Sequence, residues 1–214
     1  MSDQPNVHSN AHTPFTPKIA QPVVDPAAFI HSHAVVMGHV HIGPNVFVGP
    51  FASIRGDEGI PIHIAHDANV QDAVVIHAFE TAHNGQPIHA NLRLVDGQHY
   101  AVYIGPRVSL GHQSQIHGPA VVHHDTFVGM QALVFRATIG HHCVIEPAAK
   151  IMNVTIPPNR YVPAATVISD QHHADNLPHI TPDYPYHHLN ASVVNVNTAL
   201  AAAYNQNPRP KPTS

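Results

Sequence analysis

Large aliphatic residues recur at every sixth position along most of this chain. The longest unbroken run extends from Ile104 to Val134, and shorter runs precede and follow it. A period of six fits neither an α-helix nor an alternating strand, so it indicates a repeated structural unit of six residues. Seventeen positions form this aliphatic ladder: Ile30, Val36, Ile42, Val48, Ile54, Ile64, Val70, Ile76, Ile104, Leu110, Ile116, Val122, Val128, Val134, Ile139, Ile145 and Ile151.

The fourth residue after each ladder position is small at fifteen of the seventeen places. Glu58 and Glu80 are the two exceptions, and each stands beside a break in the ladder. One large and one small residue in every six indicates a β-solenoid, in which each hexapeptide forms a short strand and a corner. Glycine or proline often follows the ladder residue, and we expect these residues to supply the turn conformations. Seventeen hexapeptides would give nearly six triangular coils, stacked about 4.8 Å apart.

The predicted fold class is an all-β solenoid of hexapeptide repeats with a C-terminal α-helix. Apolar residues near the end of the chain have a one-sided helical spacing, from Val193 and Val194 through Val196 and Leu200 to Tyr204. The predicted segments are an extended N-terminal arm at 1–25, a β-helix domain at 26–168 with a loop excursion at 81–101, a connection at 169–185, a helix at 186–204 and a tail at 205–214.

Composition narrows the expected partners. Charged residues make up 10% of the chain, its net charge is −4, and the nine lysines and arginines form no runs, so we expect no nucleic-acid partner. No stretch approaches about 18 consecutive apolar residues, so we expect no membrane span. The N-terminus has no apolar core of a signal peptide, and Cys143 is the only cysteine. These features predict a cytoplasmic protein in a reducing compartment.

The chain contains 23 histidines, and three of them stand out by position. His77 and His117 each follow a ladder residue, and only one coil separates them if the excursion is extra. They would then stack about 4.8 Å apart, close enough for both imidazoles to bind one metal ion. His112 lies about 16 Å from His117 along an extended strand, so one chain cannot easily bring both to the same ion. A trimer packed face to face could, with His112 supplied by the neighbouring subunit.

Plainer interpretations of these residues stay open at this point. Most histidines in so His-rich a chain are expected to be ordinary surface residues. Glu58 and Glu80 could mark corners where the turn opens outward. Arg55 and Asp57 could form a surface ion pair that contributes less than about 1 kcal/mol.

Several sequence strings resemble the gamma-class carbonic anhydrases, in particular those of the archaeal type. The strings are SIRGDEGIPIHI, NVQDAVVIHAFE, VSLGHQSQIHGPA and DTFVGMQALVF, and the likeness runs from about Thr13 to Tyr204. The resemblance implies a left-handed parallel β-helix that forms a homotrimer, with one metal ion at each subunit interface. It also implies reversible hydration of CO2 to bicarbonate by a metal-bound hydroxide. The expected metal is zinc, and iron(II) or cobalt(II) would suit imidazole ligands as well.

The resemblance assigns roles to individual residues. The implied metal ligands are His77 and His117 of one subunit and His112 of the next. Glu58 matches the active-site glutamate beside the metal-bound water, and Glu80 matches the proton-shuttle glutamate. Both glutamates that interrupt the small-residue pattern therefore fall on functional positions of the family.

The resemblance also implies polar residues around the same pocket and ion pairs at the subunit contact. The implied pocket residues are Asn69, Gln71 and, from the terminal helix, Asn197. The implied interface ion pairs involve Arg55, Asp57 and Asp72.

Two features depart from the family pattern. Asn195 stands where the family has a tyrosine, and the excursion after Glu80 carries histidines in place of the family's acidic residues. An imidazole has a pKa near neutrality, so His83 or His89 could take the proton from Glu80. The alternative is that these histidines merely reflect a His-rich chain.

Two other functions remain possible for a hexapeptide-repeat chain. An acyltransferase would use a histidine as general base, and it would give no reason for the three-histidine spacing or for Glu58. A non-catalytic gamma-class scaffold protein would not need the full set of ligands and glutamates.

Overall fold

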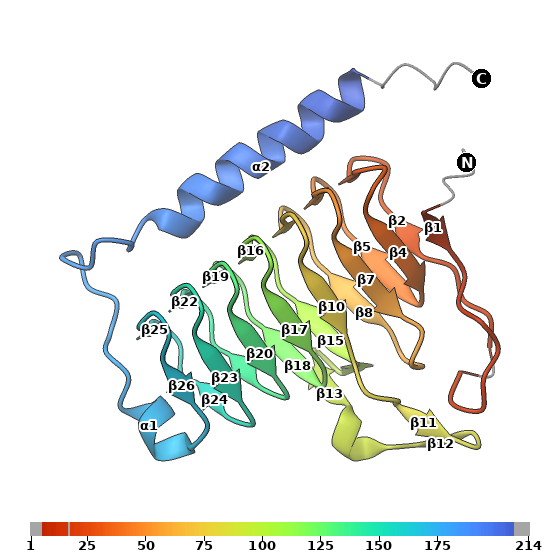
Figure 1. The fold of residues 1–214 in the computed structure, drawn as a ribbon, viewed down its shortest axis with the longest axis horizontal. Coiled ribbons are helices and arrows are strands. Elements are labelled where there is room, and N and C mark those ends of the chain that lie inside the picture. Colours follow the sequence, from red (N-terminus) through yellow and green to blue (C-terminus); the bar gives the residue numbers. More distant parts are fainter. Residues whose placement is uncertain (1–5, 17, 208–214) are drawn as a thin grey trace.

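Three parallel β-sheets form the three sides of a solenoid in the computed structural model of this chain, which describes residues 6–16 and 18–207 (Figure 1). We name them sheets A, B and C, with eight, seven and seven strands. The chain visits A, B and C in turn, so each coil adds one strand to every sheet. This arrangement confirms the predicted fold class of a parallel β-solenoid.

Every solenoid strand is short. Sheet A contains β1 (Val7–His8), β4 (Val35–Gly38), β7 (Ser53–Gly56), β10 (Val75–His77), β17 (Gln115–His117), β20 (Leu133–Phe135), β23 (Lys150–Met152) and β26 (Val167–Ile168). Sheet B contains β2 (Val23–Val24), β5 (Val40–Ile42), β8 (Ile62–Ile64), β15 (Val102–Ile104), β18 (Ala120–Val122), β21 (Thr138–Ile139) and β24 (Thr155–Ile156). Sheet C contains β3 (Phe29–Ile30), β6 (Phe47–Val48), β9 (Asn69–Val70), β16 (Ser109–Leu110), β19 (Phe127–Val128), β22 (Val144–Ile145) and β25 (Tyr161–Val162).

The aliphatic ladder fills the interior of the solenoid. All seventeen ladder residues belong to one buried core, and most have no solvent exposure at all. Small residues such as Ala34 and Ala132 are buried beside them at the corners. Alternation of large and small side chains thus packs each coil, as the six-residue period predicts.

The solenoid is longer than the nearly six coils that the sequence predicted. Strands β1 and β2 lie within the segment predicted to be an extended arm, and both pair in parallel with the coil that follows. At the other end, Ile156, Val162 and Ile168 are fully buried and continue the ladder. A shortened step after Ile151 and the neighbouring prolines hid these last repeats from the sequence pattern.

The glycines that follow ladder residues serve close packing, which corrects the prediction that they supply turn conformations. A Cβ at Gly129 would lie 2.7 Å from the carbonyl oxygen of Ile145 in the next coil. The left-handed backbone conformation at the corners is instead adopted by other residues, such as Asp125 (φ 58°) and Ala165 (φ 58°). Glycine is therefore needed where neighbouring coils approach too closely for a side chain.

The excursion forms two hairpins outside the sheets. It consists of β11 (Ala82–His83), β12 (Gln86–Pro87), a 3-10 helix η1 (His89–Asn91), β13 (Arg93–Val95) and β14 (Gln98–Tyr100). Strand β10 before it and β17 after it are direct neighbours in sheet A. The excursion is thus inserted without displacing the stacked coils.

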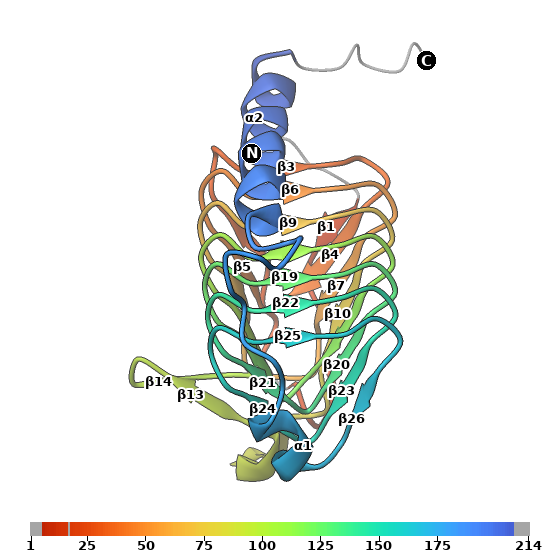
Figure 2. The same ribbon diagram turned by 90° about the vertical axis from the view of Figure 1, so that its left-hand side faces the viewer.

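The C-terminal helix α2 (Leu189–Gln206) lies along sheet C, over β3, β6, β9 and β16 (Figure 2). It begins three residues later and ends two residues later than predicted, because Tyr186–His188 form turns before it. The connection contains a short helix, α1 (Gln171–Asp175), that the sequence analysis did not predict. Most of the tail lies outside the described residues. Across residues 6–16 and 18–207, neither α1 nor α2 has the length and apolarity needed to cross a membrane.

Candidate metal centre

His77 and His117 end two neighbouring strands of sheet A and lie directly opposite each other. Their ring centroids are 5.6 Å apart and the rings are nearly perpendicular, at 84°. The ladder residues before them, Ile76 and Ile116, are paired in the same register and face the core. The buried ladder thus turns the two following imidazoles outward on the same side of the sheet.

The ring nitrogens of these histidines suit a metal ion. Nδ1 of His117 lies 3.0 Å from the carbonyl oxygen of Gly118, which can only accept, so Nδ1 carries a proton. In the neutral tautomer with that proton, Nε2 is the nitrogen that offers a lone pair to a metal ion. Nε2 of His77 is buried and has no hydrogen-bond partner. Burial lowers the pKa of His77, which keeps the ring in the neutral form that binds a cation. A divalent cation could bind the neutral form of both imidazoles through Nε2.

Two carboxylates adjoin His77. Nε2 of His77 lies 3.3 Å from Oδ1 of Asp57 and 3.5 Å from Oε1 of Glu58. Burial raises the pKa of the Glu58 carboxyl, and the charges of Asp57 and Glu80 raise it further against the opposing effect of Arg55. Glu58 is therefore easier to protonate than an ordinary glutamate, as suits a group that accepts a proton near neutral pH.

Thr81 holds the loops of the two glutamates together, a role that the sequence analysis missed. Its backbone N–H and its hydroxyl both donate to the carbonyl oxygen of Glu58, at 2.8 and 2.9 Å. The hydroxyl also accepts from the backbone N–H of Ile60 at 2.8 Å. Glu80, the preceding residue, has its carbonyl oxygen bound by the side chain of Asn91 at 2.8 Å. The only signal in the sequence was a threonine directly after an unusual glutamate.

Two phenylalanines form an apolar wall beside His117, and the sequence analysis missed both. The ring centroid of Phe79 is 4.6 Å from that of His117, and the ring centroid of Phe135 is 5.4 Å from it. Phe135 lies opposite His117 on the next strand of sheet A. The two phenylalanine rings also contact each other, with centroids 5.7 Å apart, so the imidazole of His117 packs against a pair of aromatic rings.

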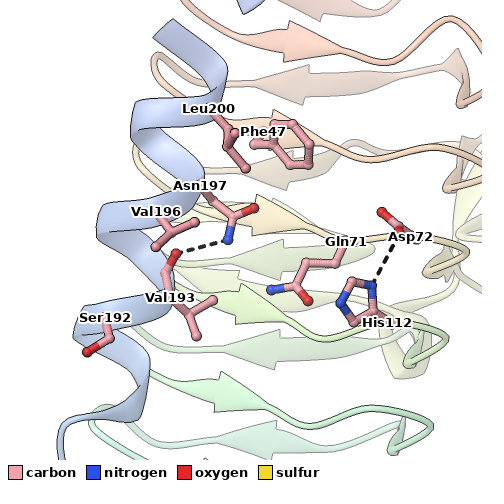
Figure 3. A pocket seen from close by; sticks show the side chains of 9 residues that line it. All are labelled: Phe47, Gln71, Asp72, His112, Ser192, Val193, Val196, Asn197 and Leu200. Carbon is pink, nitrogen blue, oxygen red and sulfur yellow. Dashed lines mark hydrogen bonds and ion pairs between the residues drawn. The ribbon is translucent and has the colours of Figure 1, made fainter. Parts of the chain in front are cut away.

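His112 lies elsewhere in the chain, in a groove of about 470 Å³ between sheet C and helix α2 (Figure 3). It follows β16, and its Nδ1 is 3.5 Å from Oδ2 of Asp72. The His112 side chain is 52% exposed. Nine residues line the groove: Phe47, Gln71, Asp72, His112, Ser192, Val193, Val196, Asn197 and Leu200.

Of the predicted pocket amides, Gln71 and Asn197 line this groove, and Asn69 holds the side chain of Gln71. The buried side chain of Asn69 donates to Ser109 at 2.9 Å and accepts from the Gln71 amide at 2.9 Å, which leaves the carbonyl oxygen of Gln71 available. Asn197 donates to the carbonyl oxygen of Val193 at 2.9 Å, and its side chain faces the groove beside Gln71 (Figure 3). The structure thus brings Gln71 and Asn197 together with His112.

The described residues contain two separate groups of candidate site residues, which we call candidate half-sites: His77 and His117 on sheet A, and His112 in the groove beside α2. On sheet A, ligand atoms of Asp57, Glu58 and His77 lie within 4.8 Å of one another, and neither His117 nor His112 belongs to this group. The predicted interface ion pairs are divided in the same way. Arg55 pairs with Asp57 at 2.9 Å in the first half-site, whereas Asp72 faces His112 in the second.

The excursion histidines are exposed in the single chain. His83 lies on β11 and His89 begins η1, both at the solvent-facing side of the excursion. The excursion begins directly after Glu80, so these residues lie on the segment that leads away from that carboxylate.

A further histidine group lies at a corner between sheets B and C. His124, Asp125 and His142 have their ligand atoms within 4.8 Å of one another. Arg107 already binds both carboxylate oxygens of Asp125, at 2.6 and 2.5 Å. The guanidinium supplies the positive charge that a metal ion would supply there.

Comparisons with known proteins first define the class of fold. The bacterial transferase hexapeptide family (six repeats) matches residues 22–56. A Bacillus cereus protein proposed to be an acetyltransferase superposes with a TM-score of 0.69 over 94% of this chain and 98% of its own, at 19% identity. A hexapeptide transferase family protein from Anaplasma phagocytophilum has a TM-score of 0.59 over 86% of this chain and 93% of its own, at 21% identity. The chain is therefore a hexapeptide-repeat β-helix protein.

A closer relative defines the family. The carbonic anhydrase of Methanosarcina thermophila is 52% identical over 202 residues, which are 94% of this chain and 82% of that protein. The chain belongs to the gamma-class carbonic anhydrases.

Other relatives have different names. The carboxysome assembly protein CcmM of Nostoc is 39% identical over 90% of this chain, but the match spans only 33% of that longer protein. The carnitine operon protein CaiE of Escherichia coli is 31% identical over 58% of this chain and 54% of its own length. Relatives of this chain therefore include proteins that are not named as carbonic anhydrases.

Proposed function

We propose that this chain catalyses the reversible hydration of CO2 to bicarbonate, in metal centres shared between the subunits of a homotrimer. The observation that carries the proposal is the paired imidazoles of His77 and His117 beside Glu58. The identity with a carbonic anhydrase over nearly the whole chain supports the same reaction.

His77 and His117 of one subunit would hold the metal, together with His112 of the next. The buried, unpartnered Nε2 of His77 and the free lone pair of His117 fit such an ion. A bound divalent cation would supply a Lewis acid that lowers the pKa of water toward neutrality. Zinc, iron(II) and cobalt(II) all suit a three-imidazole site.

Glu58 would hold the proton that the reacting water loses. Its raised pKa follows from burial and from the neighbouring charges of Asp57 and Glu80, and it brings the carboxylate closer to a neutral working pH. Thr81 directly follows Glu80 and donates two hydrogen bonds to the backbone carbonyl oxygen of Glu58. The two glutamates therefore lie on adjoining segments. Glu80 would pass the proton outward.

The second half-site would orient the substrate. Asn69 fixes the amide of Gln71, so the Gln71 carbonyl oxygen presents one acceptor in the groove next to His112. Asn197 adds a polar side chain from helix α2. In the first half-site, the rings of Phe79 and Phe135 offer an apolar surface that suits CO2, which has no net charge and no dipole.

Shared centres explain why neither half-site is complete alone. The exposed apolar side chains of Val196 (58%) and Leu200 (37%) border the groove that contains His112. A second copy would cover this surface and bring its own His77 and His117 to His112. The pairs of Arg55 with Asp57 and of Asp72 with His112 would then lie at the subunit contact.

The proton would continue from Glu80 to His83 or His89 on the excursion. Both imidazoles are exposed and lie on the segment that begins at Glu80, which supports this route. Glu80→Ala should lower kcat more than kcat/KM and should be rescued by imidazole buffer. A His83→Ala/His89→Ala double variant should lose kcat in dilute buffer in the same way. If the double variant matches the wild type there, Glu80 exchanges its proton directly with solvent.

Two other functions have support in the relatives. A scaffold role would follow the carboxysome assembly proteins, and an acyltransferase role would follow the hexapeptide transferase fold. Stopped-flow CO2 hydration with metal-replete protein separates these functions from ours. We expect rapid hydration that requires about one divalent ion per chain. Metal-replete trimers without hydration activity would favour a scaffold, and transfer of acyl groups from coenzyme A would favour an acyltransferase.

A further inference from the structure

Sheets A and B meet at the edge of the solenoid opposite helix α2, next to α1 and β13 (Figure 2). Residues at this edge line a second pocket. Its volume is about 230 Å³, and strand β13 of the excursion contributes to it together with the ends of the coils and helix α1. Arginine, threonine, asparagine and glutamine side chains make up nearly all of its lining. The lining residues are Arg93, Arg136, Thr138, Asn153, Val154, Thr155 and Gln171.

Two arginines converge in this pocket without a carboxylate between them. Burial lowers the pKa of Arg93, and the positive charge of Arg136 lowers it further. Arg93 donates to the carbonyl oxygen of Leu92 at 3.1 Å. Among residues 6–16 and 18–207, neither of these guanidiniums forms an ion pair with a carboxylate, whereas Arg55 and Arg107 each bind an aspartate. The two positively charged guanidiniums therefore lie close to each other, and most of their N–H groups are available to bind a ligand.

The neutral side chains around the arginines add further polar groups. Thr138 and Asn153 both line the pocket. Gln171 is already engaged, because its amide nitrogen donates to the Thr155 carbonyl at 2.7 Å and to Asp175 at 2.8 Å. The carboxylate of Asp175 therefore lies beside the pocket, where it accepts a hydrogen bond from Gln171 and forms no ion pair with Arg93 or Arg136.

Arg136 also connects the pocket with the metal centre. Its guanidinium lies over the ring of Phe79, 5.5 Å from the centroid, and Phe79 packs edge-on against His117. This cation–π contact fixes the guanidinium without neutralising its charge. The pocket therefore lies one aromatic ring behind a proposed metal ligand.

We propose that this pocket is a binding site for a small oxyanion, separate from the metal centre. A guanidinium offers a planar fork of donors that matches two oxygens of a carboxylate-like or phosphate-like anion, and two guanidiniums can bind opposite edges of it. Bicarbonate and inorganic phosphate share this chemistry. The inference rests on the arginine pair and the lining residues, and it holds whether or not the chain hydrates CO2.

Titration calorimetry with bicarbonate, phosphate and chloride at equal ionic strength tests the site. We expect saturable binding of at least one oxyanion, but not of chloride, by the wild type and by His117→Ala. Arg93→Gln and Arg136→Gln should each weaken that binding by about tenfold or more. Lys150→Gln removes the same charge from sheet A and should leave binding unchanged. Equal binding by all these variants, or by chloride, would overturn the proposal.

Arginine modification in the wild type provides a readout that does not depend on the variants folding. Phenylglyoxal labelling followed by mass spectrometry measures the rate at each arginine separately. A bound oxyanion should slow labelling of Arg93 and Arg136 but not of Arg160, whose side chain donates to the carbonyl oxygen of Leu177. Protection by bicarbonate alone would identify the product of hydration as the ligand, and protection by phosphate alone would identify a phosphate-type ligand. Labelling that no oxyanion slows would contradict the site.

Discussion

The Nε2 atom of His77 is buried without a hydrogen-bond partner, although two carboxylate oxygens lie 3.3 and 3.5 Å away. A buried polar atom without a hydrogen-bond partner destabilises the fold unless a bound ligand or ion interacts with it. In the proposed function, a metal ion shared with the paired imidazole of His117 is this missing partner. At the scale of single residues, the unfilled bonding capacity of His77 is thus the main sign of function.

The ligand assignment predicts which histidines matter among the 23 in the chain. His77→Ala or His117→Ala should reduce bound metal to near zero and abolish CO2 hydration, because each removes one of the three proposed ligands. His172→Ala, on the exposed side of α1, should keep both. Metal content by mass spectrometry after dialysis measures the difference. Full metal content in His117→Ala would show that the ion binds elsewhere.

Glu58 should matter for the rate more than for metal content. Glu58→Gln keeps the size of the side chain but cannot hold a proton as a carboxylate does, so kcat/KM should fall by about 100-fold. The metal should stay bound, since Glu58 is not a proposed ligand. Stopped-flow assays and metal analysis of the same preparation check both results. A variant with wild-type kcat/KM would remove Glu58 from the mechanism.

At the scale of elements, the sequence predicted the strands better than the corners. A buried aliphatic residue every six positions specifies strands directly, because the interior of each coil accepts little else. Corner glycines such as Gly105 look like turn residues, yet a Cβ there would lie 2.8 Å from a backbone nitrogen of the next coil. These contacts form between residues of neighbouring coils, which are far apart in sequence, so turn preferences of the local sequence do not predict them.

Two opposite substitutions test this account of the corners. Gly129→Ala should destabilise the fold by about 1–3 kcal/mol, because its Cβ would meet backbone 2.7 Å away. Ala165→Gly should stabilise it by up to about 1 kcal/mol, because Ala165 has a left-handed backbone with φ 58°. Urea unfolding of the two variants and the wild type measures both changes. Destabilisation of similar size in both would show that the corners require alanine and glycine for another reason.

The corner ion pair of Arg107 and Asp125 predicts a pH dependence of stability. Burial opposes ionisation of Asp125, but hydrogen bonds from Arg107 and His124 outweigh it and hold the pKa of Asp125 below its ordinary value. The stabilisation is therefore complete above about pH 4 and is lost as the pH falls through the lowered folded-state pKa.

Asp125→Asn should remove that stabilisation. The loss at pH 7 should be about 0.5–1 kcal/mol, since the Arg107 side chain is 45% exposed and solvent screens the pair. The difference from the wild type should shrink below pH 4. Asp183→Asn, at an exposed turn, serves as the control. Urea unfolding at several pH values measures the effect, and a difference that persists at low pH would contradict this explanation.

At the scale of the whole molecule, the sequence predicted the stacking of His77 on His117 and the separation of His112 from both. The aliphatic ladder was sufficient for this prediction. Three hexapeptides make one coil, so histidines at the same hexapeptide position one coil apart lie on neighbouring strands. The apolar wall of Phe79 and Phe135, the clamp by Thr81 and the arginine pocket could not be predicted, because they depend on where the excursion folds back. The shared centre itself depends on how copies meet.

The central claim is that each metal centre takes His77 and His117 from one subunit and His112 from another. His112→Ala and His117→Ala proteins are each expected to be inactive, since every centre in either trimer lacks one ligand. Unfolding and refolding a 1:1 mixture, with hybrid trimers confirmed by mass spectrometry, tests the claim through the stopped-flow rate of CO2 hydration. Random assembly leaves about one quarter of the interfaces with both intact halves, so about one quarter of the wild-type rate should return. Hybrid trimers that remain inactive would contradict the shared centre.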